Sequence, residues 1–219
     1  MKFFNGTNYS ESAKSAENDF LHILACDNGT FTVSHKESGR VFFEMPTFLI
    51  GKHDTYSYCT HATIQKCRRG QTAVFETQLA VAPPIIDVGA LALINEPVIF
   101  YNAAVLNDNS DVLSFNASLN LPNGFTENEG YEAVLRFPFG IDSPTLDDMP
   151  YEDALPRSLA PTEKVTLTDE NGDSVSLTNL SGSSVLIEIT SDGCLDVYLP
   201  TDATPNEFGL IDFEFELSF

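Results

Sequence analysis

The stretch VLIEITSDGCLDVYL, residues 185–199, decides the fold class of this chain. Apolar and polar side chains alternate on both sides of the loop Ser191-Asp192-Gly193. Residues directly opposite in an antiparallel pair share a sheet face, so folding about Asp192 brings the two apolar series together. A three-residue loop ends on a left-handed residue, which glycine adopts without steric cost. The stretch therefore predicts a β-hairpin with a positive φ at Gly193. The facing apolar residues are Val185, Ile187 and Ile189 on one strand and Leu199, Val197 and Leu195 on the other.

Two further loops repeat this pattern. They are Asp27-Asn28-Gly29 and Glu170-Asn171-Gly172, and apolar-alternating runs flank each of them. The same register about the central asparagine predicts three-residue loops with Gly29 and Gly172 at positive φ. The expected opposite pairs are Ile23 with Val33, Ala25 with Phe31, Leu167 with Val175, and Val165 with Leu177.

Strand-like runs separated by turn residues recur along the chain at a spacing typical of sandwiches and barrels. Helical periodicity is weak, and only a short helix is predicted, at residues 10–17. We therefore predict an all-β fold, an antiparallel β-sandwich or jelly-roll-like body. The predicted strands are residues 20–26, 30–35, 40–45, 55–65, 71–82, 97–101, 111–121, 131–137, 164–168, 174–178, 184–190, 194–199 and 210–219.

A proline-rich, acidic excursion at residues 138–162 interrupts this regularity. Proline cannot donate a hydrogen bond to a strand ladder, so the segment is predicted to be an extended arm or linker. It would separate an N-terminal β-sandwich, residues 1–137, from a C-terminal run of β-hairpins with a terminal strand, residues 163–219. The alternative is that all three parts form one domain. The prolines in the excursion are Pro138, Pro144, Pro150, Pro156 and Pro161.

Composition excludes several classes of function. The 219 residues have a net charge of −21, from 32 acidic against 11 basic residues, which disfavours direct binding of nucleic acid. The most apolar segment, residues 88–100, contains Asn95, Glu96 and Pro97, so no transmembrane segment is expected. The amino-terminal residues turn polar after Phe4, which predicts synthesis in the cytoplasm without a signal peptide.

One set of residues could bind a metal ion: His53, Cys59, His61 and Cys67. Cys59 and His61 lie two apart on the predicted strand 55–65 and would point to one face, as two ligands of one ion require. No paired CxxC or HxxxH spacing accompanies them. The favoured interpretation is therefore half-buried, neutral side chains, with free thiols and no metal or other cofactor.

Three carboxylates, Asp212, Glu214 and Glu216, alternate with apolar residues on the terminal strand. Paired carboxylates at the right separation catalyse glycoside hydrolysis. A solvated acidic face explains the same pattern, and the chain has no tryptophan, the residue best suited to stacking on sugar rings. Since no nucleophile, P-loop, dinucleotide or metalloprotease motif is present, no catalytic residue is assigned and the chain is not expected to be an enzyme.

Charge is distributed unevenly along the sequence. Residues 52–69 contain Lys52, Lys66, Arg68 and Arg69. A basic patch and an extended acidic arm would suit a head-to-tail contact between identical subunits, so both sets are assigned to an assembly interface. The acids of the excursion are Asp142, Asp147, Asp148, Glu152 and Asp153.

These features lead to three functional hypotheses. The first is a structural protein of a virus particle, such as a capsid, decoration or tail component of a bacteriophage. It would be located in the virion and contact copies of itself and other virion proteins. The alternative is a carbohydrate- or surface-binding β-sandwich module, which would need a concave aromatic platform drawn from the seven tyrosines. The third is a glycoside hydrolase that uses the acids of the terminal strand.

Overall fold

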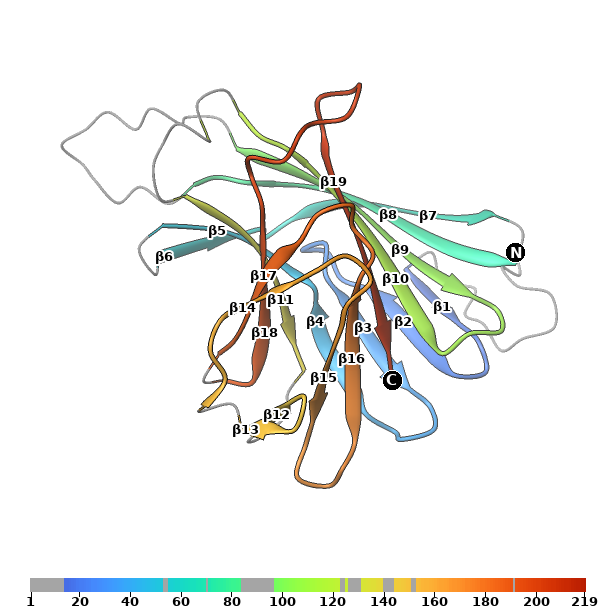
Figure 1. Cartoon of the computed structure of the whole chain (residues 1–219). Helices are drawn as coiled ribbons and strands as arrows, with labels where there is room; N and C mark the ends of the chain where they lie inside the picture. The colour runs from blue at the N-terminus through green and yellow to red at the C-terminus, as the bar shows by residue number, and fades with distance from the viewer. Residues whose placement is uncertain are drawn as a thin grey trace.

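A computed structural model describes residues 14–52, 55–69, 71–83, 97–122, 125, 131–139, 144–150, 153–190 and 192–219. These residues form three antiparallel β-sheets, and no α-helix is assigned among them (Figure 1). The predicted all-β, sandwich-like fold is confirmed. The alternation of apolar residues at every second position explains it, because each strand has one face to bury.

The largest sheet has nine strands, and two smaller sheets form the opposite layer. The nine-stranded order is β13 (Met149–Pro150), β12 (Thr145–Leu146), β15 (Lys164–Thr168), β16 (Ser174–Asn179), β19 (Ile211–Ser218), β10 (Val112–Asn120), β9 (Val98–Asn107), β8 (Thr72–Val81) and β7 (Ala62–Arg69). The six-stranded order is β14 (Arg157–Leu159), β17 (Val185–Ile189), β18 (Cys194–Leu199), β11 (Glu132–Pro138), β5 (Thr47–Lys52) and β6 (Thr55–Tyr58). The four-stranded order is β1 (Ser15–Glu17), β2 (Leu21–Ala25), β3 (Phe31–His35) and β4 (Val41–Met45).

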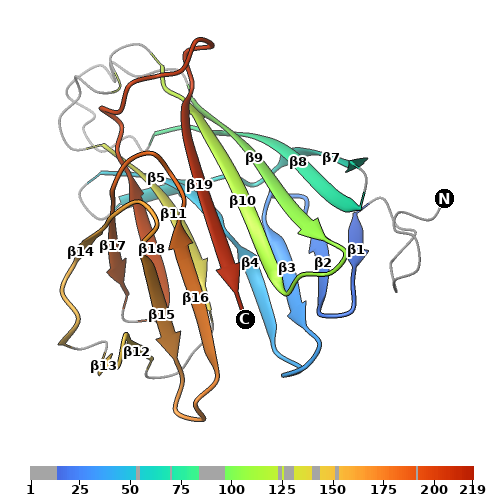
Figure 2. The ribbon, with the colours of Figure 1, turned by 45° about the vertical axis from the view of Figure 1, so that its right-hand side comes forward.

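The core lies between these two layers as one continuous cluster of buried residues (Figure 2). Phenylalanine rings join the three sheets. Phe31 on β3 lies 5.9 Å from Phe75 on β8 and 6.0 Å from Phe115 on β10, between ring centroids. Phe115 in turn lies 6.2 Å from Phe137 on β11. Each sheet therefore buries one face against this shared aromatic centre.

The three predicted hairpins are confirmed in register and turn conformation. Opposite pairs in the structure include Ile23 with Val33, Ala25 with Phe31, Leu167 with Val175, Val165 with Leu177, Ile187 with Val197, and Ile189 with Leu195. The loop glycines Gly29, Gly172 and Gly193 have φ values of 88°, 86° and 74°.

Some predicted elements are wrong. Residues 55–65 are two strands, β6 and β7, which belong to different sheets because the chain crosses from one layer to the other between them. The described part of the helix predicted at residues 10–17 contains β1, which gains ladder hydrogen bonds from β2. β5 was not predicted, since Phe48, Leu49 and Ile50 are buried on both faces and show no alternation. Most of residues 88–100 lie outside the described residues.

The excursion at residues 138–162 is more regular than predicted. Its described residues contribute the short strands β12, β13 and β14, which pair at the edges of two sheets. Pro150 lies on an edge strand, where its missing N–H removes no ladder bond. The nine- and six-stranded sheets contain strands from both sides of the excursion, as the one-domain alternative requires. The division into domains stays a prediction.

We expect the loop glycines to differ in their tolerance of a side chain. A Cβ atom at Gly29 would lie 2.5 Å from Leu79 Cδ2, whereas Gly172 has no atom within 4 Å of that position. Gly172→Ala should therefore lower the free energy of unfolding by about 1–2 kcal/mol, the cost of an alanine in the left-handed conformation. Gly29→Ala should lower it by about 1–3 kcal/mol more, because the core must also shift. Urea denaturation of the matched pair tests this, and equal losses would contradict it.

Candidate functional site

The outer face of the nine-stranded sheet presents two parallel rows of side chains across β7, β8, β9, β10 and β19. Residues in each row are direct cross-strand partners. Their side chains point outward because the residues between them along each strand point into the core. The first row is Thr63, Gln78, Tyr101, Ser118 and Asp212, and the second is Gln65, Glu76, Ala103, Asn116 and Glu214. These five strands lie side by side in both ribbon views (Figures 1 and 2).

The two rows line a groove. One depression of about 400 Å³ lies over β7 to β10, and a second of about 260 Å³ lies over β10, β19 and residues 180–182. Asn116 and Ser118 line both depressions. We call the two together the cross-strand groove. The small side chain of Ala103 beside Tyr101 leaves room for the hollow.

The lining of the cross-strand groove suits neutral polar ligands. Gln65, Gln78 and Asn116 carry amides, each of which can both donate and accept hydrogen bonds. Tyr101 is 37% exposed and offers an aromatic ring between them. The groove therefore combines an accessible ring with several two-way hydrogen-bonding groups.

The wall at the β19 end is held in place by hydrogen bonds. Ser118 Oγ donates to Asp212 Oδ1 over 2.6 Å, and Asn206 Nδ2 donates to Asp212 Oδ2 over 2.7 Å. The backbone N–H of Leu180 donates to the carbonyl of Glu214 over 2.8 Å. Buried Asn179 donates to the carbonyls of Leu159 and Ser183, at 3.0 Å each, and so fixes the loop. Hydrogen bonds thus hold the carboxylate of Asp212 and the backbone of Glu214 in place.

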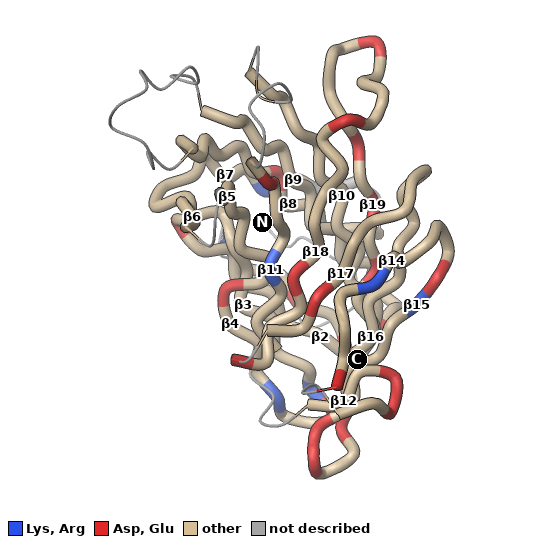
Figure 3. The backbone as a smooth tube through the Cα atoms, turned by 60° about the vertical axis from the view of Figure 1, so that its left-hand side comes forward, with Lys and Arg blue, Asp and Glu red and all other residues tan. Residues whose placement is uncertain are grey.

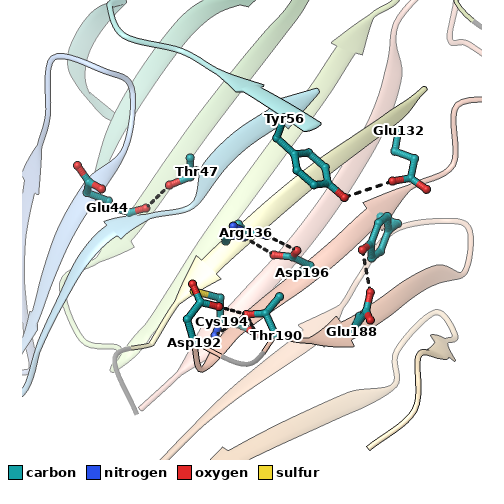
Figure 4. Close-up of polar contacts among 11 residues, drawn as sticks. Glu44, Thr47, Tyr56, Glu132, Arg136, Glu188, Thr190, Asp192, Cys194 and Asp196 are labelled. Carbon is teal, nitrogen blue, oxygen red and sulfur yellow. Dashed lines mark hydrogen bonds and ion pairs between the residues drawn. The ribbon is translucent and has the colours of Figure 1, made fainter. Parts of the chain in front are cut away.

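The outer face of the six-stranded sheet carries a second polar assembly, which we call the tyrosine–arginine cluster: Tyr56, Glu132, Arg136, Glu188, Asp196 and Tyr198. Figure 4 labels all of these residues except Tyr198. Arg136 Nε and Nη2 donate to the two carboxylate oxygens of Asp196, both over 2.7 Å. Asp196 is only 1% exposed. The Tyr56 ring lies 5.9 Å from the Arg136 guanidinium carbon. This bidentate pair satisfies a charge that would otherwise be buried without a partner.

The tyrosine hydroxyls of the cluster are paired within the chain. Tyr198 donates to Glu188 over 2.8 Å, and Tyr56 donates to Glu132 over 3.4 Å. Burial, followed by the nearby carboxylates, raises the pKa of both phenols. Because its main polar groups bond to one another, the cluster serves chiefly to cover Val134, which is fully buried beneath this face.

The predicted metal ligands do not assemble. Cys59 and His61 lie in the crossing between β6 and β7 rather than on one strand, so the prediction that they share a strand face is wrong. Cys59 Sγ donates to the His61 carbonyl over 2.9 Å, and Cys67 is half-buried on β7. His53 lies outside the described residues. The part of the chain that is described contains no group of three or more His, Cys, Asp or Glu able to hold a metal ion.

The predicted assembly residues have different environments. Lys66 Nζ donates to the Ser15 carbonyl and lies 5.7 Å from the Phe75 ring, and burial lowers the pKa of Lys66 to about 8. Asp147 forms an ion pair with Arg157 and accepts a hydrogen bond from the Thr166 N–H over 2.8 Å. Contacts within the chain thus engage one basic and one acidic member of the proposed interface. Asp148 and Asp153 are exposed.

The remaining members of that interface are not described: the side chains of Lys52, Arg68 and Arg69, and residues Asp142 and Glu152. The contact between subunits therefore stays a prediction. Acidic residues occur at several hairpin ends and along the strands, and basic residues are fewer (Figure 3). Among the described residues, no helix has the length and apolar content to cross a membrane.

Sequence reasoning did not find the cross-strand groove. Its signals were the polar alternation Ser114, Asn116, Ser118 and Asn120 on the strand predicted at residues 111–121, and the alternating acids Asp212 and Glu214 on the terminal strand. These patterns identify the outward faces of two strands, but they do not show which strands are neighbours in the sheet. Tyr101, Gln78 and Gln65 become groove residues only through the order of strands in the sheet.

The chain matches no protein-family model, and no curated protein is similar to it in sequence. Several solved structures share its fold. An α-mannosidase from Enterococcus faecalis V583 is 15% identical, with a TM-score of 0.74 over 98% of this chain and 30% of that one. A glycosyl hydrolase family 38 protein from Enterococcus faecalis is 16% identical, with a TM-score of 0.75 over 99% and 31%.

The 4-α-glucanotransferase from Thermococcus litoralis is 9% identical, with a TM-score of 0.56 over 95% of this chain and 38% of that one. This chain thus spans about a third of the length of these proteins. At such low identities the likeness concerns the fold.

The tyrosine–arginine cluster should make the protein sensitive to alkali. Burial raises the pKa of the neighbouring Cys194 thiol to about 11, and the pKa values of Tyr56 and Tyr198 are also raised. The folded protein holds these protons to higher pH than the unfolded chain, in which thiols have a pKa of about 8.5 and phenols a pKa of about 10. Their contribution to stability is complete below about pH 8.5 and is lost as pH rises toward 11.

We therefore expect the free energy of unfolding, measured by urea denaturation, to fall through this alkaline range. The fall should be shallower in a Cys194→Ser, Tyr198→Phe double variant. Tyr58→Phe, at an exposed tyrosine of β6, is the control and should follow the parent. If the free energy of unfolding falls equally steeply with pH in the parent and the double variant, Cys194 and Tyr198 do not cause the sensitivity to alkali.

Proposed function

We propose that this chain is a carbohydrate-binding β-sandwich domain and that the cross-strand groove holds the sugar. The observation that carries this proposal is the lining of the groove, where Tyr101 stands among the amides of Gln65, Gln78 and Asn116. A sugar ring has an apolar face that packs on an aromatic side chain and hydroxyls that both donate and accept hydrogen bonds. The groove offers both kinds of contact on one open surface.

The comparisons support the same class of ligand. Three solved structures that share this fold at TM-scores above 0.5 are named as an α-mannosidase, a glycosyl hydrolase family 38 protein and a 4-α-glucanotransferase. This chain corresponds in extent to about a third of each. We infer that it acts as a domain concerned with glycans.

This proposal replaces the virus-particle hypothesis. That hypothesis rested on an all-β body without a recognisable site motif, on the acidic composition and on the expected lack of a signal peptide, and the separation of basic and acidic residues supported its subunit contact. The groove supplies a site, and nothing in the fold or the comparisons supports a virion, capsid or bacteriophage role. A contact between copies through the basic and acidic sets stays a separate prediction.

We propose a binding rather than a hydrolytic role. Asp212 and Glu214 leave the same strand toward the same face, whereas glycosidase carboxylates flank the scissile bond. Glu76 lies three strands away from Glu214, roughly 14 Å across the sheet at the usual strand spacing. That separation exceeds the upper limit of about 9.5 Å for an inverting pair.

The test measures binding of neutral oligosaccharides by isothermal titration calorimetry, with α-linked mannose, α-1,4-linked glucose and β-1,4-linked N-acetylglucosamine as probes. Tyr101→Ala should weaken the best binder about tenfold, since loss of the packed ring costs about 1.4 kcal/mol. Tyr58→Ala removes a tyrosine that is 64% exposed on β6, outside the groove, and should bind as the parent does. The proposal fails if the parent binds no sugar, or if both variants lose affinity equally.

A further inference from the structure

The cross-strand groove has a strong charge bias. Glu76, Asp212 and Glu214 line it, and no Lys or Arg is among its described lining residues. The chain as a whole also has a negative net charge, of −21. Among these described lining residues an anionic ligand would meet only carboxylates as charged groups, whereas a neutral ligand is tolerated and a cationic one is attracted.

The groove is also long. Its two rows cross five strands, from the edge strand β7 to β19. Four strand spacings of about 4.8 Å give a length of roughly 19 Å, which exceeds a single sugar ring several times over. A linear oligosaccharide lying across the strands would fill it, and a monosaccharide would not.

The acidic end of the groove is preorganised. Both oxygens of Asp212 accept hydrogen bonds that hold the carboxylate in place, and the loop at residues 180–183 anchors the backbone of Glu214. Glu214 is exposed at the end of the second row. Binding of an ammonium group at this end would therefore require little loss of side-chain entropy at Asp212.

Resting on the proposed function, we infer that the groove selects a linear oligosaccharide bearing amino groups. The chain of sugars lies along the two rows, with Tyr101 beneath one ring and an amine between Asp212 and Glu214. Neutral oligosaccharides bind more weakly, and uronic acid oligosaccharides are rejected.

The experiment compares three β-1,4-linked hexasaccharides by calorimetry at low salt: glucosamine, N-acetylglucosamine and glucuronic acid. The measurement is made at mildly acidic pH, which keeps the amines of the glucosamine hexamer protonated. We expect the glucosamine hexamer to bind about 3- to 30-fold more tightly than the N-acetylated one, as one or two exposed ion pairs provide. High salt should remove this preference. The glucuronic acid hexamer should not bind, and affinity for glucosamine oligomers should rise with length until the groove is filled.

Three carboxylates on β19 provide the variants. Asp212→Asn and Glu214→Gln should each reduce the ratio of the affinity for the glucosamine hexamer to the affinity for the N-acetylated hexamer. Glu216→Gln makes the same change of charge one row outside the groove and should keep the preference.

Each outcome discriminates. If no sugar binds, in this series or among the neutral probes, the proposed function itself fails. If neutral sugars bind but the glucosamine hexamer is not preferred, or the glucuronic acid hexamer binds equally well, the charge selection is wrong and the binding function stands. If Glu216→Gln lowers the preference as much as Glu214→Gln, the effect comes from overall charge and the placement of the amine is wrong.

Discussion

The burial of one apolar face per sheet is the constraint on which the rest of this structure depends. Phe31, Phe75, Phe115 and Phe137 meet at the centre and hold the nine-stranded sheet against the four- and six-stranded sheets. Burial of this kind is the largest favourable contribution to folding, so it determines which side of each strand faces inward. The composition of the outward side is then free to serve solubility or recognition.

The two outer faces use that freedom differently. On the six-stranded sheet, Arg136, Asp196, Tyr56 and Tyr198 pair with nearby groups and close over Val134. Such a network is favourable only when its members are satisfied, which explains why its partners lie within the chain. On the nine-stranded sheet the amides and Tyr101 line a hollow, so they face solvent and any ligand within it.

Electrostatics joins the groove to the chain as a whole. The chain has a net charge of −21, and the same excess of carboxylates continues into the wall formed by β19. Lys66, by contrast, turns inward to the Ser15 carbonyl and the Phe75 ring. The groove therefore differs from the surrounding surface in shape and in its aromatic ring, and it shares the negative charge of that surface.

The sequence by itself determined the local units of this protein, because turn chemistry and period-two alternation act over about ten residues. Gly29, Gly172 and Gly193, the hairpin registers, and the outward direction of Asn116, Ser118 and Asp212 could all be derived this way. The order of strands could not. It depends on which apolar faces bury best together across the whole chain, as the split of residues 55–65 between two sheets shows. Only that long-range choice placed Gln65, Gln78 and Tyr101 in one row system with Asp212 and Glu214, and so made a groove from residues far apart in sequence.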